Sequence, residues 1–63
     1  MLTNQERCDI ILASLFPDQP SLIEKWWTSP NKAFDLSTPS QMFEQDESRV
    51  VKYLYGQLNS DYS

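Results

Sequence analysis

The sequence predicts an all-α fold, a small single-domain bundle of four to five short helices. Apolar residues recur at the spacing of one helix face near both ends of the chain. Threonine and proline stand where further helices would begin, and the segment "PNKAFDLS" shows no alternation typical of a strand. Because the chain has 63 residues, we expect one domain over residues 1–63 with a small core.

The first helix is expected to begin at Thr3. Glu6 follows three residues later, and in this pattern a hydroxyl and a carboxylate satisfy the free amides of a helix start. The apolar stripe that follows has helical spacing and consists of Cys8, Ile11, Leu12 and Leu15. "PDQP" should end this helix, because proline lacks an amide proton and restricts the residue before it.

The place of Cys8 on this stripe predicts a small, buried, structural thiol. A reactive Cys8 is the alternative, and it would need an exposed, electropositive setting. Because it is the only cysteine, no disulfide can form within the chain, and a lone thiol fits a reducing cytoplasm.

A second helix is expected to open near Pro20 or Ser21, since proline is tolerated in the first turn of a helix. It should end at "TSP". The large apolar residues that it would present are Leu22, Ile23, Trp26 and Trp27. The following "PNKAFDLS" should form one short helical turn and then a loop.

Two further helices are expected after this loop. Thr38 can cap a short helix that has Pro39 at its first position and that points Met42 and Phe43 inward. Asp46 or Ser48 can cap the last helix, whose expected apolar stripe consists of Val51, Leu54, Tyr55 and Leu58. Gly56 within it costs about 1 kcal/mol relative to alanine, which suggests either a close approach by another backbone or a point of early fraying.

Composition and charge weigh against several classes of function. The net charge is −4 and the basic residues are dispersed, which is unfavourable for binding nucleic acid. No apolar run approaches the ~20 residues of a membrane helix, and the start is unlike a signal peptide, so we expect a soluble cytoplasmic protein. With no histidine and a single glycine, we expect no enzyme activity, no catalytic residues, no metal site and no cofactor.

The aromatic residues are the candidates for binding a protein partner, because tryptophan and tyrosine dominate the energetic centres of interfaces. Trp26 and Trp27 are adjacent, so they lie ~100° apart on a helix. Either both are core, or Trp26, which shares a face with Leu22 and Ile23, is core and Trp27 is exposed. For Tyr62, a solvated tail and a docked tail both stay open. The candidate partner-binding residues are Trp27, Phe34, Tyr53, Tyr55 and Tyr62.

The segments "IEKWWTSPNKAFDLSTPSQMF" and "VVKYLYGQL" resemble the toxin-binding domain of the Xre/MbcA/ParS-like antitoxins. In that family a helix ending in Trp-Leu precedes Thr-Pro-Asn, an Ala-Leu-Gly segment, a Thr-Pro helix start and a last helix rich in Val and Leu. The match covers residues 22–58. Its positions are Trp26 and Trp27, then Ser29, Pro30 and Asn31, then Ala33 and Phe34, then Thr38 and Pro39, and finally Met42 and Phe43.

The sequence departs from the family pattern in three places. Leu36 stands near the usual glycine, "NSDYS" stands where the family has Tyr-Gly, and the residues before "PDQP" are too few for the family's N-terminal helix-turn-helix-like region. By resemblance, the partner is a RES-domain toxin, an enzyme that consumes NAD, and the antitoxin inhibits it by covering the entrance to its active site.

We therefore expect a non-enzymatic protein-binding module, similar to a stand-alone antitoxin domain that binds and inhibits a toxin. Two alternatives stay open. One is a small acidic inhibitor from a phage or mobile element that acts on another host protein. The other is a helical structural subunit whose aromatic residues form a homodimer.

Overall fold

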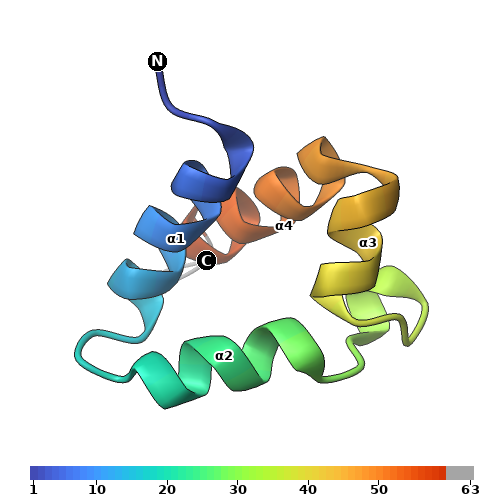
Figure 1. Cartoon of the computed structure of the whole chain (residues 1–63), viewed down its shortest axis with the longest axis horizontal. Helices are drawn as coiled ribbons and strands as arrows, with labels where there is room; N and C mark the ends of the chain where they lie inside the picture. Colours follow the sequence, from blue (N-terminus) through green and yellow to red (C-terminus); the bar gives the residue numbers. More distant parts are fainter. Residues whose placement is uncertain (60–63) are drawn as a thin grey trace.

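The computed structural model describes residues 1–59, and every regular element in this part of the chain is a helix. The elements are α1 (Asn4–Leu15), α2 (Pro20–Thr28), the 3-10 helix η1 (Lys32–Phe34), α3 (Pro39–Gln45) and α4 (Glu47–Asn59) (Figure 1). The predicted all-α fold of four to five short helices is confirmed.

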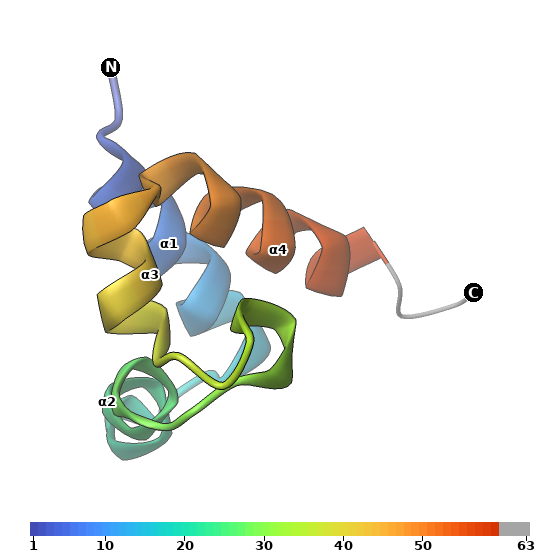
Figure 2. The same cartoon turned by 90° about the vertical axis from the view of Figure 1, so that its right-hand side faces the viewer.

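The four α-helices surround one small core. The helix α2 crosses the C-terminal end of α1 and the N-terminal end of α3 (Figure 1), and it packs against both. The helix α4 packs against α1 and α3 as well, and Figure 2 shows it running along the side of the molecule away from α2. Two helices that are not neighbours in sequence, α1 and α4, are therefore brought together in space.

Two reciprocal capping boxes fix where α1 and α3 begin. The amide of Glu6 donates to Thr3 Oγ1 (3.1 Å), and the amide of Thr3 donates to Glu6 Oε1 (2.9 Å). Thr38 and Gln41 repeat this arrangement with the same two distances, 3.1 and 2.9 Å. Each box satisfies amides that have no partner within the helix, and both predicted helix starts are confirmed.

A single residue, Asp46, separates α3 from α4. Its amide donates to the Met42 carbonyl at the end of α3 (2.7 Å). Its Oδ1 accepts from the Ser48 hydroxyl (2.9 Å) and from the amide of Arg49 (3.4 Å) at the start of α4. Of the two predicted caps for α4, Asp46 therefore takes this role.

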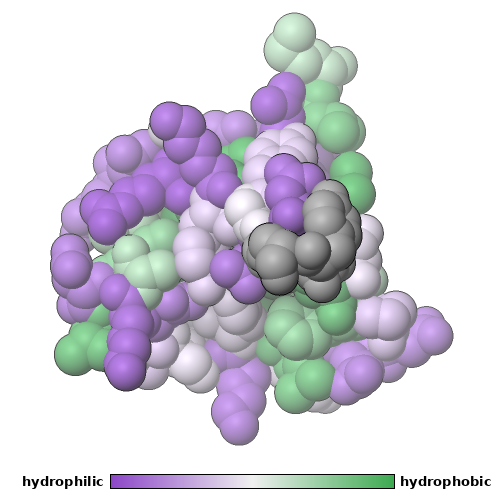
Figure 3. Space-filling model, turned by 180° about the vertical axis from the view of Figure 1, so that it is seen from behind, coloured by the Kyte–Doolittle hydropathy of each residue, from purple (hydrophilic) through white to green (hydrophobic). Residues whose placement is uncertain are grey.

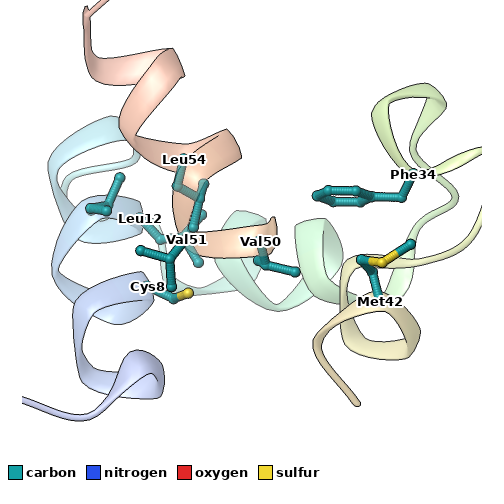
Figure 4. Packing of buried hydrophobic residues seen from close by; sticks show 8 residues of the cluster. Cys8, Leu12, Phe34, Met42, Val50, Val51 and Leu54 are labelled. Atoms are coloured by element: carbon teal, nitrogen blue, oxygen red, sulfur yellow. The ribbon is translucent and has the colours of Figure 1, made fainter. Parts of the chain in front are cut away.

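The core is drawn from α1, η1, α3 and α4 (Figure 4). Its buried residues are Cys8, Ile11, Leu12, Phe34, Met42, Val50, Val51 and Leu54. Figure 4 shows Val50 between two groups, with Cys8, Leu12, Val51 and Leu54 on one side of it and Phe34 and Met42 on the other. Val50 is 0% exposed, so α4 buries side chains toward two neighbours at once.

Because α4 is buried against two neighbours, the apolar stripe predicted for this last helix is partly wrong. Val51 and Leu54 are buried as expected, but Tyr55 is 45% exposed and Val50 takes the inward position that the stripe omitted. The reason is that α4 contacts both α1 and α3, so its apolar face is wider than one row and turns toward Val50, away from Tyr55. Of the two alternatives for Gly56, a close backbone approach is wrong, because a Cβ added there would meet nothing within 4 Å.

The loop between η1 and α3 contains two consecutive residues in the left-handed region, Asp35 (φ 55°) and Leu36 (φ 69°). Asn31 closes this loop. Its Oδ1 accepts from the amide of Ala33 (2.9 Å), its carbonyl accepts from the amide of Leu36 (3.0 Å), and its own amide donates to the Ser37 carbonyl (3.0 Å). A leucine at positive φ is strained, and Leu36 is 66% exposed, so little packing offsets that strain.

We expect Leu36→Gly to be more stable than Leu36→Ala. Both substitutions remove the exposed side chain, but only glycine adopts the left-handed conformation without the penalty of a Cβ, about 1–2 kcal/mol. After the greater flexibility of glycine in the unfolded chain is subtracted, the difference should be about 0.5–1 kcal/mol in the free energy of unfolding, measured in urea. An alanine variant as stable as the glycine variant would contradict the strain at Leu36.

Cys8 is fully buried (0% exposed), which confirms the predicted structural thiol. Burial raises the pKa of this thiol from 9.0 to about 11, and the nearby charges of Asp9 and Glu47 add to the effect. A thiol in this setting stays protonated and is a poor nucleophile near neutral pH.

The raised pKa of Cys8 predicts a loss of stability at high pH. Above pH 9 the thiol ionises in the unfolded chain but stays neutral in the folded one, so its contribution is present below pH 9 and is lost as the pH rises to about 11. Across this interval the free energy of unfolding of the wild type should fall by up to about 2 kcal/mol more than that of Cys8→Ala, which lacks this thiol. Parallel stability curves for the two proteins in urea unfolding would contradict this expectation.

Candidate functional site

Three aromatic rings meet where α2 packs against α3. The rings of Trp26 and Trp27, both on α2, are 5.1 Å apart at 81°. Trp27 also contacts Phe43 on α3, with ring centroids 5.7 Å apart and planes at 89°. These are edge-to-face contacts, which add about 0.5–1.5 kcal/mol per pair beyond the area that they bury. The two helices are thus joined through Trp27.

An open groove of about 380 Å³ lies beside this cluster. It is lined by one residue of α1, one of α2 and three of α3, namely Gln5, Trp27, Ser40, Phe43 and Glu44. These three helices are the ones nearest the viewer in Figure 1, with α4 behind them. Two aromatic side chains at right angles therefore form part of an open hollow at the surface.

The polar side chains of the groove differ in how they are held. The Nε2 group of Gln5 donates to Asp9 Oδ1 (3.1 Å), one turn further along α1. Within residues 1–59, the side chains of Ser40 and Glu44 have no hydrogen-bond or ion-pair partner. The groove thus presents a carboxylate and a hydroxyl that are free to bind a ligand group.

Of the two alternatives for the tryptophans, the division into a core Trp26 and an exposed Trp27 is wrong, and full burial of both is not observed either. Both are half-buried, and both pack against the core. The physical reason is Phe43, which lies 16 residues beyond Trp27 in the chain and covers part of its ring. Neighbours within α2 alone could not indicate this contact.

The prediction of Phe34 as a partner-binding residue is corrected by its burial. Its ring is 1% exposed and lies 5.2 Å from the ring of Tyr53, so Phe34 belongs to the core. Tyr53 is half-buried in this contact. Tyr55 is exposed on α4 but does not line the groove, and Tyr62 lies outside the described residues.

Of the predicted binding residues, the groove thus contains only Trp27. The side chains that sequence reasoning missed are Gln5, Ser40 and Glu44, and Phe43 was expected only to point inward. A signal for three of them exists in the sequence, because Ser40, Phe43 and Glu44 stand at i, i+3 and i+4 and share one face of α3.

Other apolar side chains reach the surface without lining the groove. They are Met1, Leu2, Ile10, Leu22, Leu36 and Tyr55. In Figure 3, which shows the molecule from behind, the apolar atoms lie mainly along the side formed by α1. Within residues 1–59, no helix has the length and apolar character needed to cross a membrane, and no three acidic, cysteine or histidine residues are grouped as metal ligands would be.

We expect Trp27→Ala to destabilise the protein more than Trp26→Ala does. Replacing Trp27 removes two ring contacts, whereas replacing Trp26 removes one, so the free energies of unfolding should differ by about 1 kcal/mol. Tyr55→Ala is the control, because loss of an exposed aromatic side chain should change stability by less than about 0.5 kcal/mol. Urea unfolding followed by circular dichroism measures all three. A Trp27→Ala variant as stable as the wild type would contradict the packing role of this ring.

Because comparisons with known proteins give no match, the groove is the basis for a functional assignment. No family model, no curated protein and no solved structure matches this chain.

Proposed function

We propose that this chain is a non-enzymatic protein-binding module, a stand-alone antitoxin-type domain that binds and inhibits a partner enzyme of the NAD-consuming RES type. One observation supports this most directly: Trp27 and Phe43 line an open groove where α1, α2 and α3 meet. Large aromatic side chains in such hollows are the usual energetic centres of protein interfaces.

The composition of the groove favours binding over catalysis. Among its lining residues only Glu44 has a side chain that commonly exchanges a proton, and no base within residues 1–59 is hydrogen-bonded to Ser40. A nucleophile of this kind needs an adjacent base to act. Cys8, the other candidate nucleophile, is buried with a raised pKa. The groove is therefore better suited to holding a side chain than to transforming it.

The antitoxin part of the proposal rests on where the resemblance falls in the fold. The matching Trp26 and Trp27 lie near the end of α2, and the matching Thr38 and Pro39 form the start of α3. These are the two elements whose contact builds the aromatic side of the groove. A toxin-binding surface inherited with this sequence pattern would include it.

A pair of matched arginine variants tests the proposal. Ser40 and Ser21 both follow a proline at the start of a helix and both are exposed, but only Ser40 lines the groove. Ser40→Arg should fill the groove without disturbing the core, and Ser21→Arg should leave the groove open. We expect wild type and Ser21→Arg to capture a RES-type enzyme from source cells and to stop its consumption of NAD at equimolar ratio, and Ser40→Arg to lose at least about tenfold in affinity, the loss typical of a disrupted interface centre.

The other outcomes of this experiment decide between functions. If an unrelated host protein is captured and Ser40→Arg prevents this capture, the result would favour a function as an inhibitor of another target. Self-association in sedimentation, abolished by Ser40→Arg, would favour a homodimeric subunit. Equal capture of the enzyme by all three proteins would mean that the groove is not part of the binding surface, and it would contradict the proposal.

A further inference from the structure

We infer that the groove receives the side chain of an arginine from a basic segment of the protein partner. This inference rests on the proposed function in so far as it takes the groove to be a protein-binding surface. It adds the chemistry of the group that is bound, which follows from the charge, the ring geometry and the hydrogen-bonding capacity of the lining residues.

The charge of the groove is negative. Glu44 is the one charged residue among the five that line it, and it has no cationic partner within residues 1–59. The whole chain has a net charge of −4, so the wider field also attracts cations. Glu44 is exposed, so an apolar side chain in the groove would gain nothing from its carboxylate. A cationic side chain would gain a surface ion pair with it.

The aromatic geometry suits a planar cation. The planes of Trp27 and Phe43 meet at 89°, so they form a corner of two perpendicular walls. A guanidinium group stacked on one ring presents its edge to the other, and its N–H groups remain in its own plane, directed outward to acceptors. Arginine is also less strongly hydrated than lysine, so it loses less on entering an aromatic hollow.

The polar lining offers acceptors to match. Gln5 already donates through Nε2 to Asp9, which leaves its Oε1 as an acceptor. Ser40 and Glu44 provide a hydroxyl oxygen and a carboxylate without partners within residues 1–59. Arginine is a donor with five N–H groups and no acceptor. The groove and the guanidinium group are therefore complementary in charge, in shape and in the direction of their hydrogen bonds.

A titration with blocked amino acids tests this inference without any knowledge of the partner. The probes are N-acetyl-arginine methylamide, its citrulline analogue, which has nearly the same shape but no charge, and the lysine analogue. Binding is followed by the chemical shifts of the indole N–H groups and of the α3 amides. A single side chain should bind with an affinity on the order of millimolar.

We expect arginine to change the chemical shifts of the Trp27 indole N–H and of the Ser40 and Glu44 amides. Lysine should bind more weakly than arginine, and citrulline should bind more weakly than arginine by roughly fivefold or more. Glu44→Gln should weaken arginine binding by roughly threefold or more, and added salt should weaken it in the wild type. Glu24→Gln is the matched control, because Glu24 is an exposed glutamate on α2 that does not line the groove, and it should leave binding unchanged. Equal binding of arginine and citrulline, or no effect of Glu44→Gln, would overturn the inference.

The failure of this inference can be told apart from the failure of the proposed function. If a partner binds through the groove, as judged by the Ser40→Arg variant, but Glu44→Gln leaves its affinity unchanged, the proposed function stands and the arginine inference falls. If arginine saturates the groove in the titration but no protein partner is captured, the preference of the groove for arginine stands, whereas the proposed function and the protein source of the arginine fall.

Discussion

The fold depends on the burial of one helix face, that of α4, against two partners at the same time. Val50 is the residue where this constraint is most visible, because it is completely buried between the group around Cys8 and Leu12 and the group around Phe34 and Met42 (Figure 4). A 63-residue chain can bury only a small core. With α4 in place, α1 and α3 are held on either side of it, and α2 then closes the remaining edge through Trp27 and Phe43.

The groove is a by-product of how α2 completes this arrangement. The rings that join α2 to α3 are half-buried and not fully enclosed, so the side of the contact that faces away from the core forms the lining of the groove. Under the proposed function, the same rings would serve both stability and recognition. A bound side chain that packs on Trp27 would also brace the α2–α3 contact, and binding would stabilise the whole fold.

Most of the fold could be predicted from the sequence because its signals are local. The two capping boxes, the prolines that open α2 and α3, and the stripe of Cys8, Ile11 and Leu12 all depend on residues within one or two helical turns of each other. The site could be predicted in this way only in part, through the shared face of Ser40, Phe43 and Glu44 on α3. The covering of Trp27 by Phe43, the burial of Phe34 and the turn of α4 toward Val50 depend on contacts between elements that are distant in sequence, and a helix considered alone contains no information about them.

Asp46 alone connects α3 to α4, so this connection has no spare length. Because this one residue ends α3 and caps α4, the direction of each helix is set by the backbone torsions of a single position. An inserted residue would have to lengthen one of the helices and rotate its apolar face by about 100°, or break both caps. The loop at residues 16–19 has no such double role and joins α1 to α2 over several residues. Changes of length in the history of this protein should therefore be found between α1 and α2 and not between α3 and α4.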